Sequence, residues 1–553
     1  MHTATFDYII IGAGSAGSVL ANRLSEDSSN QVLVLEAGPE DKSPLIKIPG
    51  AFSYFMYSKK YNWAYEAESV PDIRQGQPVF CPRGKTLGGS SAVNAMVYIR
   101  GHRSDYDRWE QLGNKGWGFD TMLPYFKKSE TNERGASEYH GNKGPLYVSN
   151  VRNDYPMNER FISGAKTAGF PLSNDFNGHQ FEGAGYYQFT IQDGERCGVS
   201  RAYLKPARVR QNLNIECEAF VDRILFENKV AVGVEYTQNE SKFIVRARKE
   251  IILCGGSFNS PQTLMVSGIG DKEALQQHGI EVIHDLPGVG KNLQEHVDAS
   301  VLVKSKKKDG FSITPSGLLK MAPDALKYFM SKTGKLASSI TQAGAFLKSN
   351  PDVEVPDIQM HFVPLLFDDC GRDLKLLAAH GYSLHVCVLR PKSRGQLSLR
   401  SADPKDPIKI DFNFLSDPQD QKVLVDGIRA ARKILASADF DDYRGEEIHP
   451  GENVESDEEL LQKCKDKLGL VYHPTGTCKM GSDPMAVVDD QLRVHGVSNL
   501  RVVDCSIMPT LISGNTNAPV IAIAERAADL ILQQITVEEA SKLENGEYAV
   551  SYR

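Results

Sequence analysis

The segment 6–38 is the feature that most constrains the fold of this chain. It begins with "FDYIIIG" (6–12), a run of β-branched and aromatic residues that ends at a glycine and predicts a buried strand. The turn "GAGSAG" (12–17) follows, then a helical segment with Val19, Leu20 and Leu24 on one face, and then a second strand, "QVLVLEAG" (31–38), that contains Glu36 at its end. Strand, glycine turn, helix, strand and acid in this order predict a Rossmann-like unit that binds a dinucleotide. A glycine-rich turn without a ligand is the alternative.

The residue types of this unit each have a physical role in such a site. Three glycines in the turn permit a tight bend and the close approach of a pyrophosphate to the positive end of the following helix. Glu36 lies 19 residues beyond the last of these glycines and is placed to accept hydrogen bonds from an adenosine ribose. The predicted cofactor-binding residues of this unit are Gly12, Gly14, Ser15, Ala16, Gly17, Glu36 and Ala37.

No second stretch of the chain completes this fingerprint. Both "GIGDKE" (268–273) and "GVGKNL" (288–293) lack the third glycine. A flavoenzyme that takes hydride from NAD(P)H through a dedicated Rossmann domain usually shows two fingerprints. With one, we expect the bound dinucleotide to be the catalytic cofactor itself.

Length and composition exclude several classes of protein. A chain of 553 residues exceeds the size of one ordinary hydrophobic core, so we expect two domains or one heavily elaborated domain. The net charge of −7 is mild and gives no reason to propose a nucleic-acid partner. The nine cysteines are scattered and include no C-x-x-C pair, which favours a reducing compartment and argues against a structural zinc site.

The same sequence leads to an expected location. The first residues lack a basic region followed by a long apolar stretch, so we expect no secretory signal. No run approaches the roughly 18 apolar residues that a membrane span needs. We therefore expect a cytoplasmic protein, and peripheral attachment to the inner face of the cytoplasmic membrane stays open as an alternative. Nothing in the sequence indicates the oligomeric state.

A second unusual segment is "CPRGKTLGGSSAVNAMVYIRGHRSDYDRW" (81–109). Small residues at 88–92 are followed by the polar Asn94 inside an otherwise apolar run. Such a segment suits a backbone that packs closely against a large flat ligand, with Asn94 as its polar contact. A plain glycine loop before a strand is the alternative.

The histidines raise the question of a catalytic base. His473 lies in "VYHPTGTCKMG" (471–481), between a short apolar run and a turn-rich segment, and it could be a surface residue, a metal ligand or a base. The thirteen histidines include no H-x-H, no H-E-x-x-H and no Cys/His cluster, so we expect no metal. His361 and His385 lie in strand-like runs, where we expect hydrogen-bonded histidines on a sheet face.

Four widely spaced motifs together resemble the glucose–methanol–choline (GMC) oxidoreductase family of FAD enzymes. They are "GAGSAG…LEAG", "GKTLGGSSAVNAMVYIRG", "GGSFNSPQTLMVSGIG" (255–270) and "YHPTGTCKMG…LRVVDCSIMPTLISGNTNAP" (472–519). The resemblance covers nearly the whole chain and is closest to the bacterial branch with choline dehydrogenases and medium-chain aliphatic alcohol dehydrogenases. Thr263 and Glu295 depart from the usual family residues. Family members with covalent FAD carry a histidine where this chain has Val93, so we expect FAD to be held without a covalent bond.

The resemblance implies roles for the remaining candidate residues. His473 would be the base that takes the hydroxyl proton, and Asn515 would be the second active-site residue, which holds the substrate oxygen. Val221 would contact adenine through its backbone. Asp504 would lie near the ribityl–pyrophosphate, or simply cap the following helix, and Trp63 would lie near the cofactor or pack in the core. The other residues with an implied cofactor role are Gly89, Ser90, Asn94, Ala95, Met96, Val97, Asn515 and Thr516.

The resemblance also implies an α/β fold. We expect a Rossmann-like FAD-binding domain of the GMC type, built from 1–150, 195–300 and 468–535. The substrate domain, 151–194 and 301–467, is expected to be an antiparallel sheet flanked by helices that covers the flavin face. The last residues, 536–553, are expected to form a polar tail.

The expected activity is the oxidation of a primary alcohol to the aldehyde, with electrons passed to a quinone or another acceptor that is not NAD. Gln342 stands where close relatives often have Glu, and "FVPLLF" (362–367) offers an apolar lining, so we expect a neutral alcohol rather than a quaternary ammonium. An alcohol oxidase that uses O2, a choline dehydrogenase and, more remotely, a hydroxynitrile lyase with purely structural FAD are the alternatives.

Overall fold

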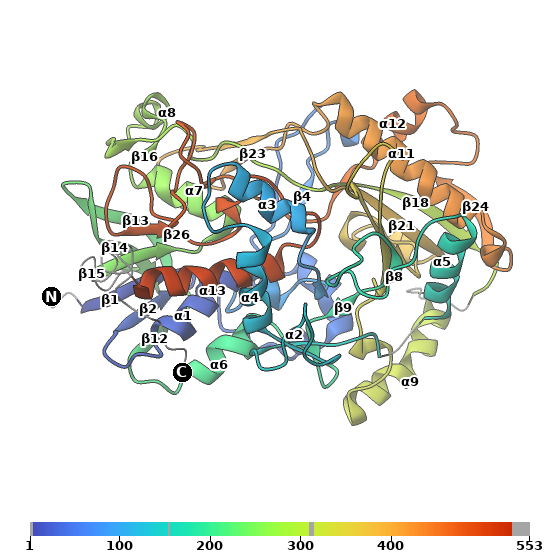
Figure 1. Cartoon of the computed structure of the whole chain (residues 1–553), viewed down its shortest axis with the longest axis horizontal. Coiled ribbons are helices and arrows are strands. Elements are labelled where there is room, and N and C mark those ends of the chain that lie inside the picture. Colours follow the sequence, from blue (N-terminus) through green and yellow to red (C-terminus); the bar gives the residue numbers. More distant parts are fainter. Residues whose placement is uncertain (1–3, 153–154, 309–313, 534–553) are drawn as a thin grey trace.

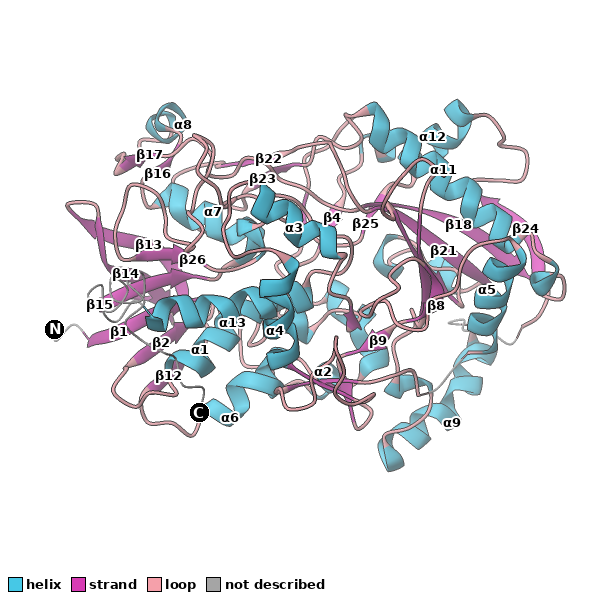
Figure 2. Ribbon diagram, viewed as in Figure 1, coloured by secondary structure: helices cyan, strands magenta, loops and turns pink. Residues whose placement is uncertain are grey.

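The computed structural model describes residues 4–152, 155–308 and 314–533. Two large sheets lie at opposite ends of its long axis, with helices and long loops between and around them (Figure 1; Figure 2). The polar tail predicted for 536–553 lies outside the described residues.

The first sheet contains the nucleotide-binding unit predicted from the sequence. Its central strands pair in parallel and are almost completely buried on both faces, as strands covered on two sides must be. Two further strands extend it as an antiparallel meander. In spatial order the strands are β12 (Leu213–Glu216), β2 (Val32–Leu35), β1 (Ala4–Ile11), β15 (Ser241–Leu253), β14 (Val230–Gln238) and β13 (Phe220–Glu227), and β26 (Leu500–Val502) also pairs with β15.

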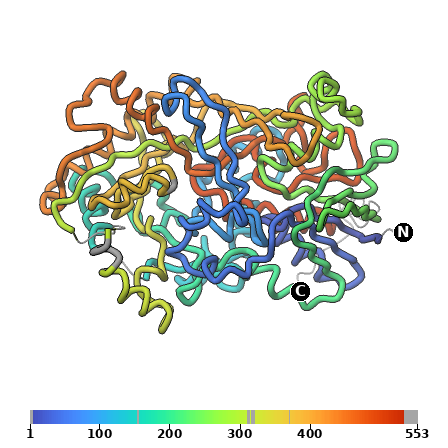
Figure 3. The backbone as a smooth tube through the Cα atoms, turned by 180° about the vertical axis from the view of Figure 1, so that it is seen from behind, coloured from blue at the N-terminus to red at the C-terminus, as the bar shows by residue number. Residues whose placement is uncertain are grey.

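Helices from both ends of the chain pack on this sheet. α1 (Ser15–Leu24) lies beside α13 (Asn517–Gln533), and α4 (Phe119–Ser129) packs against α13 (Figure 1). α13 is apolar around most of its circumference, which fits a helix buried between a sheet and its neighbours. Seen from behind, the first and last described segments therefore share one half of the molecule (Figure 3).

The second sheet is antiparallel throughout. Its strand order is β24 (Arg444–His449), β18 (Val297–Ser305), β21 (Gly381–Val388), β20 (Ile358–Val363), β19 (Ala343–Leu347) and β8 (Gly183–Tyr186), and β25 (Gly469–Leu470) also pairs with β18. The helices that pack on it are α5 (Pro156–Thr167), α11 (Pro418–Leu435) and α12 (Asp457–Asp466). This arrangement is the fold class expected from the sequence.

The two faces of the second sheet differ in character. On β20, Phe362 stacks on Phe161 of α5 with ring centroids 5.2 Å apart, and Ile358 lies beneath Gly427 of α11. Because side chains alternate along a strand, the intervening Gln359 and His361 point to the opposite face. That polar face looks toward the first sheet.

Short elements connect the two sheets. The remaining helices are α2 (Pro44–Lys47), α3 (Arg103–Gln111), α6 (Lys205–Ala207), α7 (Gly256–Val266), α8 (Lys272–Gln277), α9 (Pro315–Ser331) and α10 (Leu374–Leu377). The remaining strands pair two by two: β3 (Tyr65–Glu66) with β4 (Phe80–Cys81), β5 (Val97–Tyr98) with β9 (Gln188–Phe189), β6 (Glu130–Asn132) with β7 (Leu146–Val148), β10 (Ile191–Gln192) with β11 (Glu195–Arg196), β16 (Ile269–Gly270) with β17 (His284–Asp285), and β22 (Gln396–Ser398) with β23 (Lys409–Asp411). Within the described ranges, no helix has both the length and the hydropathy needed to cross a membrane.

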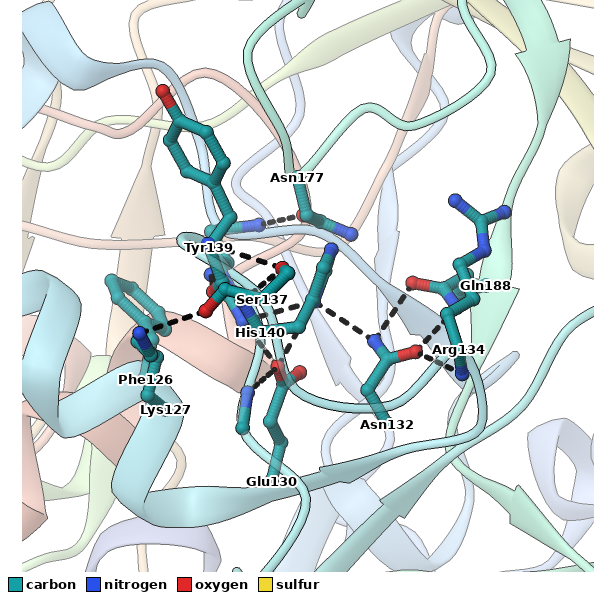
Figure 4. A network of polar contacts seen from close by, with 12 residues as sticks. Phe126, Lys127, Glu130, Asn132, Arg134, Ser137, Tyr139, His140, Asn177 and Gln188 are labelled. Atoms are coloured by element: carbon teal, nitrogen blue, oxygen red, sulfur yellow. Dashed lines mark hydrogen bonds and ion pairs between the residues drawn. The ribbon is translucent and has the colours of Figure 1, made fainter.

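A buried polar network fixes the loop after β6 (Figure 4). The Arg100 guanidinium donates to the Glu130 carboxylate at 2.6 Å, and His140 lies 3.0 Å from the same carboxylate and 2.7 Å from Asp175. Arg100, Glu130 and His140 are all buried, so each charge depends on the others for compensation. His140 is therefore a structural histidine.

The chain passes between the two sheets several times. We propose the division into 1–150, 195–300 and 468–535 on one side and 151–194 and 301–467 on the other. Two strands of the second sheet extend past these boundaries, since β18 begins at Val297 and β25 is Gly469–Leu470.

Candidate active site

The turn between β1 and α1 is made of glycines for steric reasons. Gly12 has φ +98°, and a Cβ there would lie 2.6 Å from the Cys254 carbonyl oxygen at the end of β15. A Cβ on Gly17 would lie 1.9 Å from the Gly12 carbonyl oxygen. Neither position can carry a side chain, because the backbone of α1 packs directly on the strand ends.

The middle glycine of this turn faces a different environment. A Cβ on Gly14 would have only the Gly89 Cα within contact distance, at 4.0 Å, and Gly14 lines a large cavity. Gly89 belongs to the second motif, and a Cβ on it would lie 2.8 Å from the Gly14 Cα. The two glycine turns, 12–17 and 88–89, thus meet at the N-terminus of α1 and form what we call the glycine cradle.

Glu36 supports this cradle as well as lining the cavity. Its two carboxylate oxygens accept hydrogen bonds from the backbone N–H groups of Ala13, at 2.9 Å, and Gly38, at 2.8 Å. Burial raises the pKa of Glu36 to about 7. Each oxygen keeps a further lone pair for a ligand hydroxyl.

The cavity extends from the glycine cradle to the polar face of the second sheet and has a volume of about 390 Å³. Gly17 is the one predicted cofactor residue that does not line it, because that glycine is needed for packing. Those that line it are Gly12, Gly14, Ser15, Ala16, Glu36, Ala37, Trp63, Gly89, Ser90, Asn94, Ala95, Met96, Val97, Val221, Asp504, Asn515 and Thr516.

Two of these residues are held by local hydrogen bonds. Asn94 Oδ1 accepts from the Met96 N–H at 3.0 Å and from the Arg196 guanidinium at 2.8 Å, which leaves its Nδ2 for the cavity. Burial lowers the pKa of Arg196 to about 9. Asp504 caps the 3-10 helix Cys505–Ile507 and also lines the cavity, while its place near the ribityl–pyrophosphate stays a prediction.

The predicted catalytic pair meets in the same cavity. His473 Nε2 lies 3.2 Å from Asn515 Nδ2, although 42 residues separate them in the chain. The backbone N–H of His473 donates to Glu295 Oε1 at 2.7 Å, which anchors the loop. Burial, together with the nearby His296 and His361, lowers the pKa of His473 well below its usual range. His473 is therefore a neutral imidazole, the protonation state that a base requires.

Two histidines on the polar face of the second sheet, His361 and His385, line the cavity, although the sequence predicted only hydrogen-bonded histidines on a sheet face. His385 is a satisfied sheet histidine, as predicted: it lies 2.8 Å from Asp298 and 3.1 Å from the Phe367 carbonyl oxygen. Burial lowers its pKa, but Asp298 outweighs this and the pKa is raised. His361 differs from the prediction, because it lines the cavity and its ring has no hydrogen-bond partner within the described part of the chain. Burial lowers the pKa of His361 to about 3.

Gln342 does not face the substrate cavity, although the sequence-based expectation of a neutral substrate assumed that it does. It is fully buried and absent from the cavity wall, with its amide bonded to Asn158 at 2.7 Å and to Ser338 at 2.7 Å. The neighbouring Thr341 lines the cavity instead. The residue at 342 therefore does not set the charge of the substrate pocket.

Sequence reasoning also missed one wall of the cavity. Phe52 and Met56, from the 3-10 helix Pro49–Tyr57, line it together with Phe367, and the rings of Phe52 and Phe367 lie 6.4 Å apart. No glycine, charge or motif marks this helix in the sequence. Within the described residues, no group of three or more His, Cys, Asp or Glu side chains could hold a metal ion.

Known proteins resemble this chain over nearly its whole length. Two family models, both described as GMC oxidoreductase, match residues 6–298 and 391–524. An alcohol dehydrogenase [acceptor] from Pseudomonas putida is 44% identical over 96% of this chain and 96% of its own length. An oxygen-dependent choline dehydrogenase from Vibrio vulnificus is 44% identical over 96% of this chain and 94% of its own length. 

Solved structures share the fold over nearly the whole chain. Pyridoxine 4-oxidase from Mesorbium loti is 31% identical, with a TM-score of 0.85, over 95% of this chain and 98% of its own. A formate oxidase variant from Aspergillus oryzae, described in a study of FAD modification, is 28% identical with a TM-score of 0.88, over 96% of this chain and 99% of its own.

Proposed function

Because the chain belongs to the GMC oxidoreductase family, we propose that it is an FAD-dependent alcohol dehydrogenase that oxidises a primary alcohol to the aldehyde and passes the electrons to a quinone or another acceptor that is not NAD. The observation that carries this proposal is the contact between His473 Nε2 and Asn515 Nδ2, 3.2 Å apart in the cavity that also contains the glycine cradle. A neutral base beside a hydrogen-bond donor is what the oxidation of an alcohol requires.

The residues of the glycine cradle fit FAD. The open direction at Gly14, the N-terminus of α1 and the spare lone pairs of Glu36 suit a pyrophosphate followed by a ribose. Asn94 Nδ2 would contact the flavin, and Val221, which lines the cavity, would contact the adenine. Bound FAD would supply the acceptor of the hydride that leaves the carbinol carbon.

His473 and Asn515 would act on the substrate oxygen. His473 Nε2 would accept the hydroxyl proton, while an N–H of Asn515 would hold the oxygen as negative charge develops on it. General base catalysis of this kind contributes typically about 10²–10⁴-fold to the rate.

The charges around the cavity favour a neutral alcohol. Of the carboxylates that line it, Asp298 is paired with His385 at 2.8 Å and Asp368 with Lys467 at 3.0 Å, so neither is a free counter-charge for a cation. Phe52 and Phe367 add apolar surface. An aliphatic or aromatic primary alcohol would bind here without leaving a charge unpaired.

Anaerobic mixing of the purified yellow protein with 1-octanol, benzyl alcohol and choline tests this function. We expect a neutral alcohol to bleach the flavin absorption band, and a quinone to restore the band faster than air does. Rapid reoxidation by air with release of peroxide would favour an alcohol oxidase instead. Bleaching by choline alone would favour a choline dehydrogenase, the activity named for the relative from Vibrio vulnificus. Failure of every alcohol, together with cyanohydrin cleavage, would favour the remote hydroxynitrile lyase.

We also propose that FAD is bound without a covalent link. Val93 is buried and lines the cavity, and its hydrocarbon side chain cannot form a bond to the flavin. Acid denaturation followed by filtration should therefore release all of the flavin absorbance into the filtrate. Flavin that stays on the precipitated protein would contradict this assignment.

The outer face of α9 supports peripheral association with a membrane. Leu319, Leu326, Phe329 and Met330 of α9 are each between 61% and 78% exposed, whereas Tyr328 is fully buried. Leu319, Leu326 and Met330 recur at helical spacing, so the apolar stripe points outward, the reverse of an ordinary surface helix.

The surroundings of α9 match a lipid surface. Tyr54 and Tyr57, on the 3-10 helix that packs near α9, are also exposed. Exposed lysines lie just after this 3-10 helix (Lys59 and Lys60) and on α9 itself (Lys327). Phe52 and Met56 of the same 3-10 helix line the cavity, so lipid-soluble alcohols and quinones would enter from this side. We propose that the chain is cytoplasmic and docks on the inner face of the cytoplasmic membrane through this surface.

Vesicle flotation tests the docking surface. The double variant Leu326→Glu/Phe329→Glu should no longer float with vesicles that contain anionic phosphatidylglycerol, because it places two charges in the apolar stripe. Val209→Glu is the matched control, since Val209 is 85% exposed after α6 at the other end of the molecule. Unchanged flotation of the double variant, or self-association in solution that the same variant abolishes, would contradict the assignment to a membrane.

A further inference from the structure

The catalytic imidazole must carry its proton on one particular nitrogen. His473 can accept the hydroxyl proton at Nε2 only if its own proton is on Nδ1. Its two nitrogens have one close side-chain neighbour each: His296 Nδ1 lies 2.9 Å from His473 Nδ1, and Asn515 Nδ2 lies 3.2 Å from His473 Nε2. The partners of these two neighbours decide where the proton is.

A first chain of hydrogen bonds acts through His296. His296 Nε2 lies 3.1 Å from the backbone carbonyl oxygen of Leu389, and a carbonyl can only accept, so this nitrogen carries a proton. Burial lowers the pKa of His296 to about 4, so the ring is neutral and its Nδ1 is a bare acceptor. The hydrogen bond to His473 then requires the proton on His473 Nδ1, which leaves His473 Nε2 free.

A second chain acts through Gln359 and does not involve His296. The Tyr187 hydroxyl donates to the Met360 carbonyl oxygen at 2.8 Å, so the Tyr187 oxygen accepts from Gln359 Nε2 at 3.2 Å. The same amide nitrogen donates to Asn515 Oδ1 at 3.2 Å. Asn515 must therefore turn its Nδ2 toward His473, where it meets a bare Nε2.

The two chains of hydrogen bonds start from different backbone carbonyls. Both lead to the same result, an N–H of Asn515 directed at an unprotonated His473 Nε2. Met360 belongs to β20, and Leu389 directly follows β21, so both carbonyls are parts of the second sheet. All the side chains in the two chains are buried or nearly so, and water cannot easily offer alternative partners. Agreement between independent chains is the strongest evidence that a static structure can give for a tautomer and an amide orientation.

We propose that His296 and Gln359 are positioning residues that fix the proton of the base: His296 keeps it on His473 Nδ1, and Gln359 turns the donor group of Asn515 toward His473 Nε2. This inference rests on the proposed function, since it concerns the base of that reaction. When an alcohol binds, its O–H takes the single lone pair of His473 Nε2 in place of the Asn515 N–H, and that N–H is then available for the alcohol oxygen. After proton transfer the His473 imidazolium still donates from Nδ1 to His296, so the relay needs no rearrangement.

Replacement of His296 tests the first chain. His296→Phe removes the acceptor, and we expect anaerobic flavin reduction to slow by about 10–100-fold, the range seen when partners that orient a catalytic group are lost. His296→Asn restores an acceptor near the Nδ1 position and should recover part of the rate. The apparent affinity for the alcohol and the FAD content should change little in either variant. His449→Phe, at another buried histidine that does not line the cavity, is the matched control.

Two substitutions of Gln359 can be ranked by their rate of flavin reduction. A role in packing and a role in hydrogen bonding predict opposite rankings. Gln359→Glu has nearly the same shape, but two acceptor oxygens would draw Asn515 Nδ2 away from His473 and turn Oδ1 toward the bare Nε2. Gln359→Met removes the amide without reversing Asn515. We therefore expect Gln359→Glu to reduce flavin more slowly than Gln359→Met. A role in packing alone predicts the reverse order.

The outcomes separate this inference from the proposed function. Histidine-selective 15N NMR of the holoenzyme, compared with His473→Gln for assignment, should show a bare Nε2 and a protonated Nδ1 on His473 in the wild type and a mixture in His296→Phe. If His296→Phe reduces flavin at the wild-type rate, or if His296→Asn is no better than His296→Phe, the relay is wrong while the base stands. If His473→Gln itself reduces flavin at the wild-type rate, the assignment of the base fails and with it the relay.

Discussion

His473→Ala should retain FAD but reduce it about 10²–10⁴-fold more slowly when mixed with a neutral primary alcohol without oxygen. The imidazole lines the cavity beside Asn515 and is not part of the glycine cradle, so its loss should remove the proton acceptor and leave the contacts of the cradle intact. No other described histidine is hydrogen-bonded to Asn515, and the cavity histidine His385 is paired with Asp298. Stopped-flow absorbance at the flavin band gives the rate.

The control for this variant is His449→Ala. His449 is also a buried histidine but, unlike His473, it does not line the cavity. It should reduce flavin at the wild-type rate. Fast reduction in His473→Ala with a normal FAD content would show that a different group takes the proton. Loss of FAD from His473→Ala would show that this histidine belongs to the cofactor site.

Gly14→Glu should abolish FAD retention. A side chain at this position extends into the cavity beside Gly89, where the pyrophosphate would approach the N-terminus of α1, and a carboxylate there adds repulsion between like charges. Gly14 has φ −72°, so the backbone accepts a side chain without strain and the protein should still fold. The ratio of flavin to protein absorbance after purification measures the effect.

Gly14→Ala is the matched control, since its methyl group would have only the Gly89 Cα nearby, at 4.0 Å. We expect it to retain more flavin than Gly14→Glu, and both variants should have the circular dichroism of the wild type. A yellow Gly14→Glu protein with the wild-type flavin content would mean that the pyrophosphate does not bind at the cradle.

The parts of this fold that could be predicted from the sequence are those encoded over short distances. The order of strand, glycine turn, helix and acid at 6–38 follows from residue type and spacing, and the structure contains β1, α1 and β2 at these places. The sequence did not show that Gly17 is a packing residue. Only the folded backbone shows that a side chain at this position would collide with the Gly12 carbonyl and that Gly17 does not face a ligand.

The parts that could not be predicted depend on contacts between distant strands. His296 and His473 are separated by 177 residues, and Gln359 and Asn515 by 156, and no local pattern marks such pairs. His361 looked like an ordinary strand histidine because its sequence does not show which face of the sheet meets the cavity. For Gln342 the error was the reverse: it was expected to face the substrate, but its side chain points into the core although the neighbouring residue lines the cavity.

In the proposed reaction, one cavity brings a flavin, a base and an alcohol together. A single anaerobic turnover can check this: the wild-type protein is mixed with excess benzyl alcohol, the loss of the flavin band is followed, and benzaldehyde is quantified by chromatography. The predicted result is complete bleaching with benzaldehyde formed in equimolar amount to the flavin. A flavin that stays oxidised, or bleaches without aldehyde, while the other primary alcohols behave in the same way, would contradict the claim.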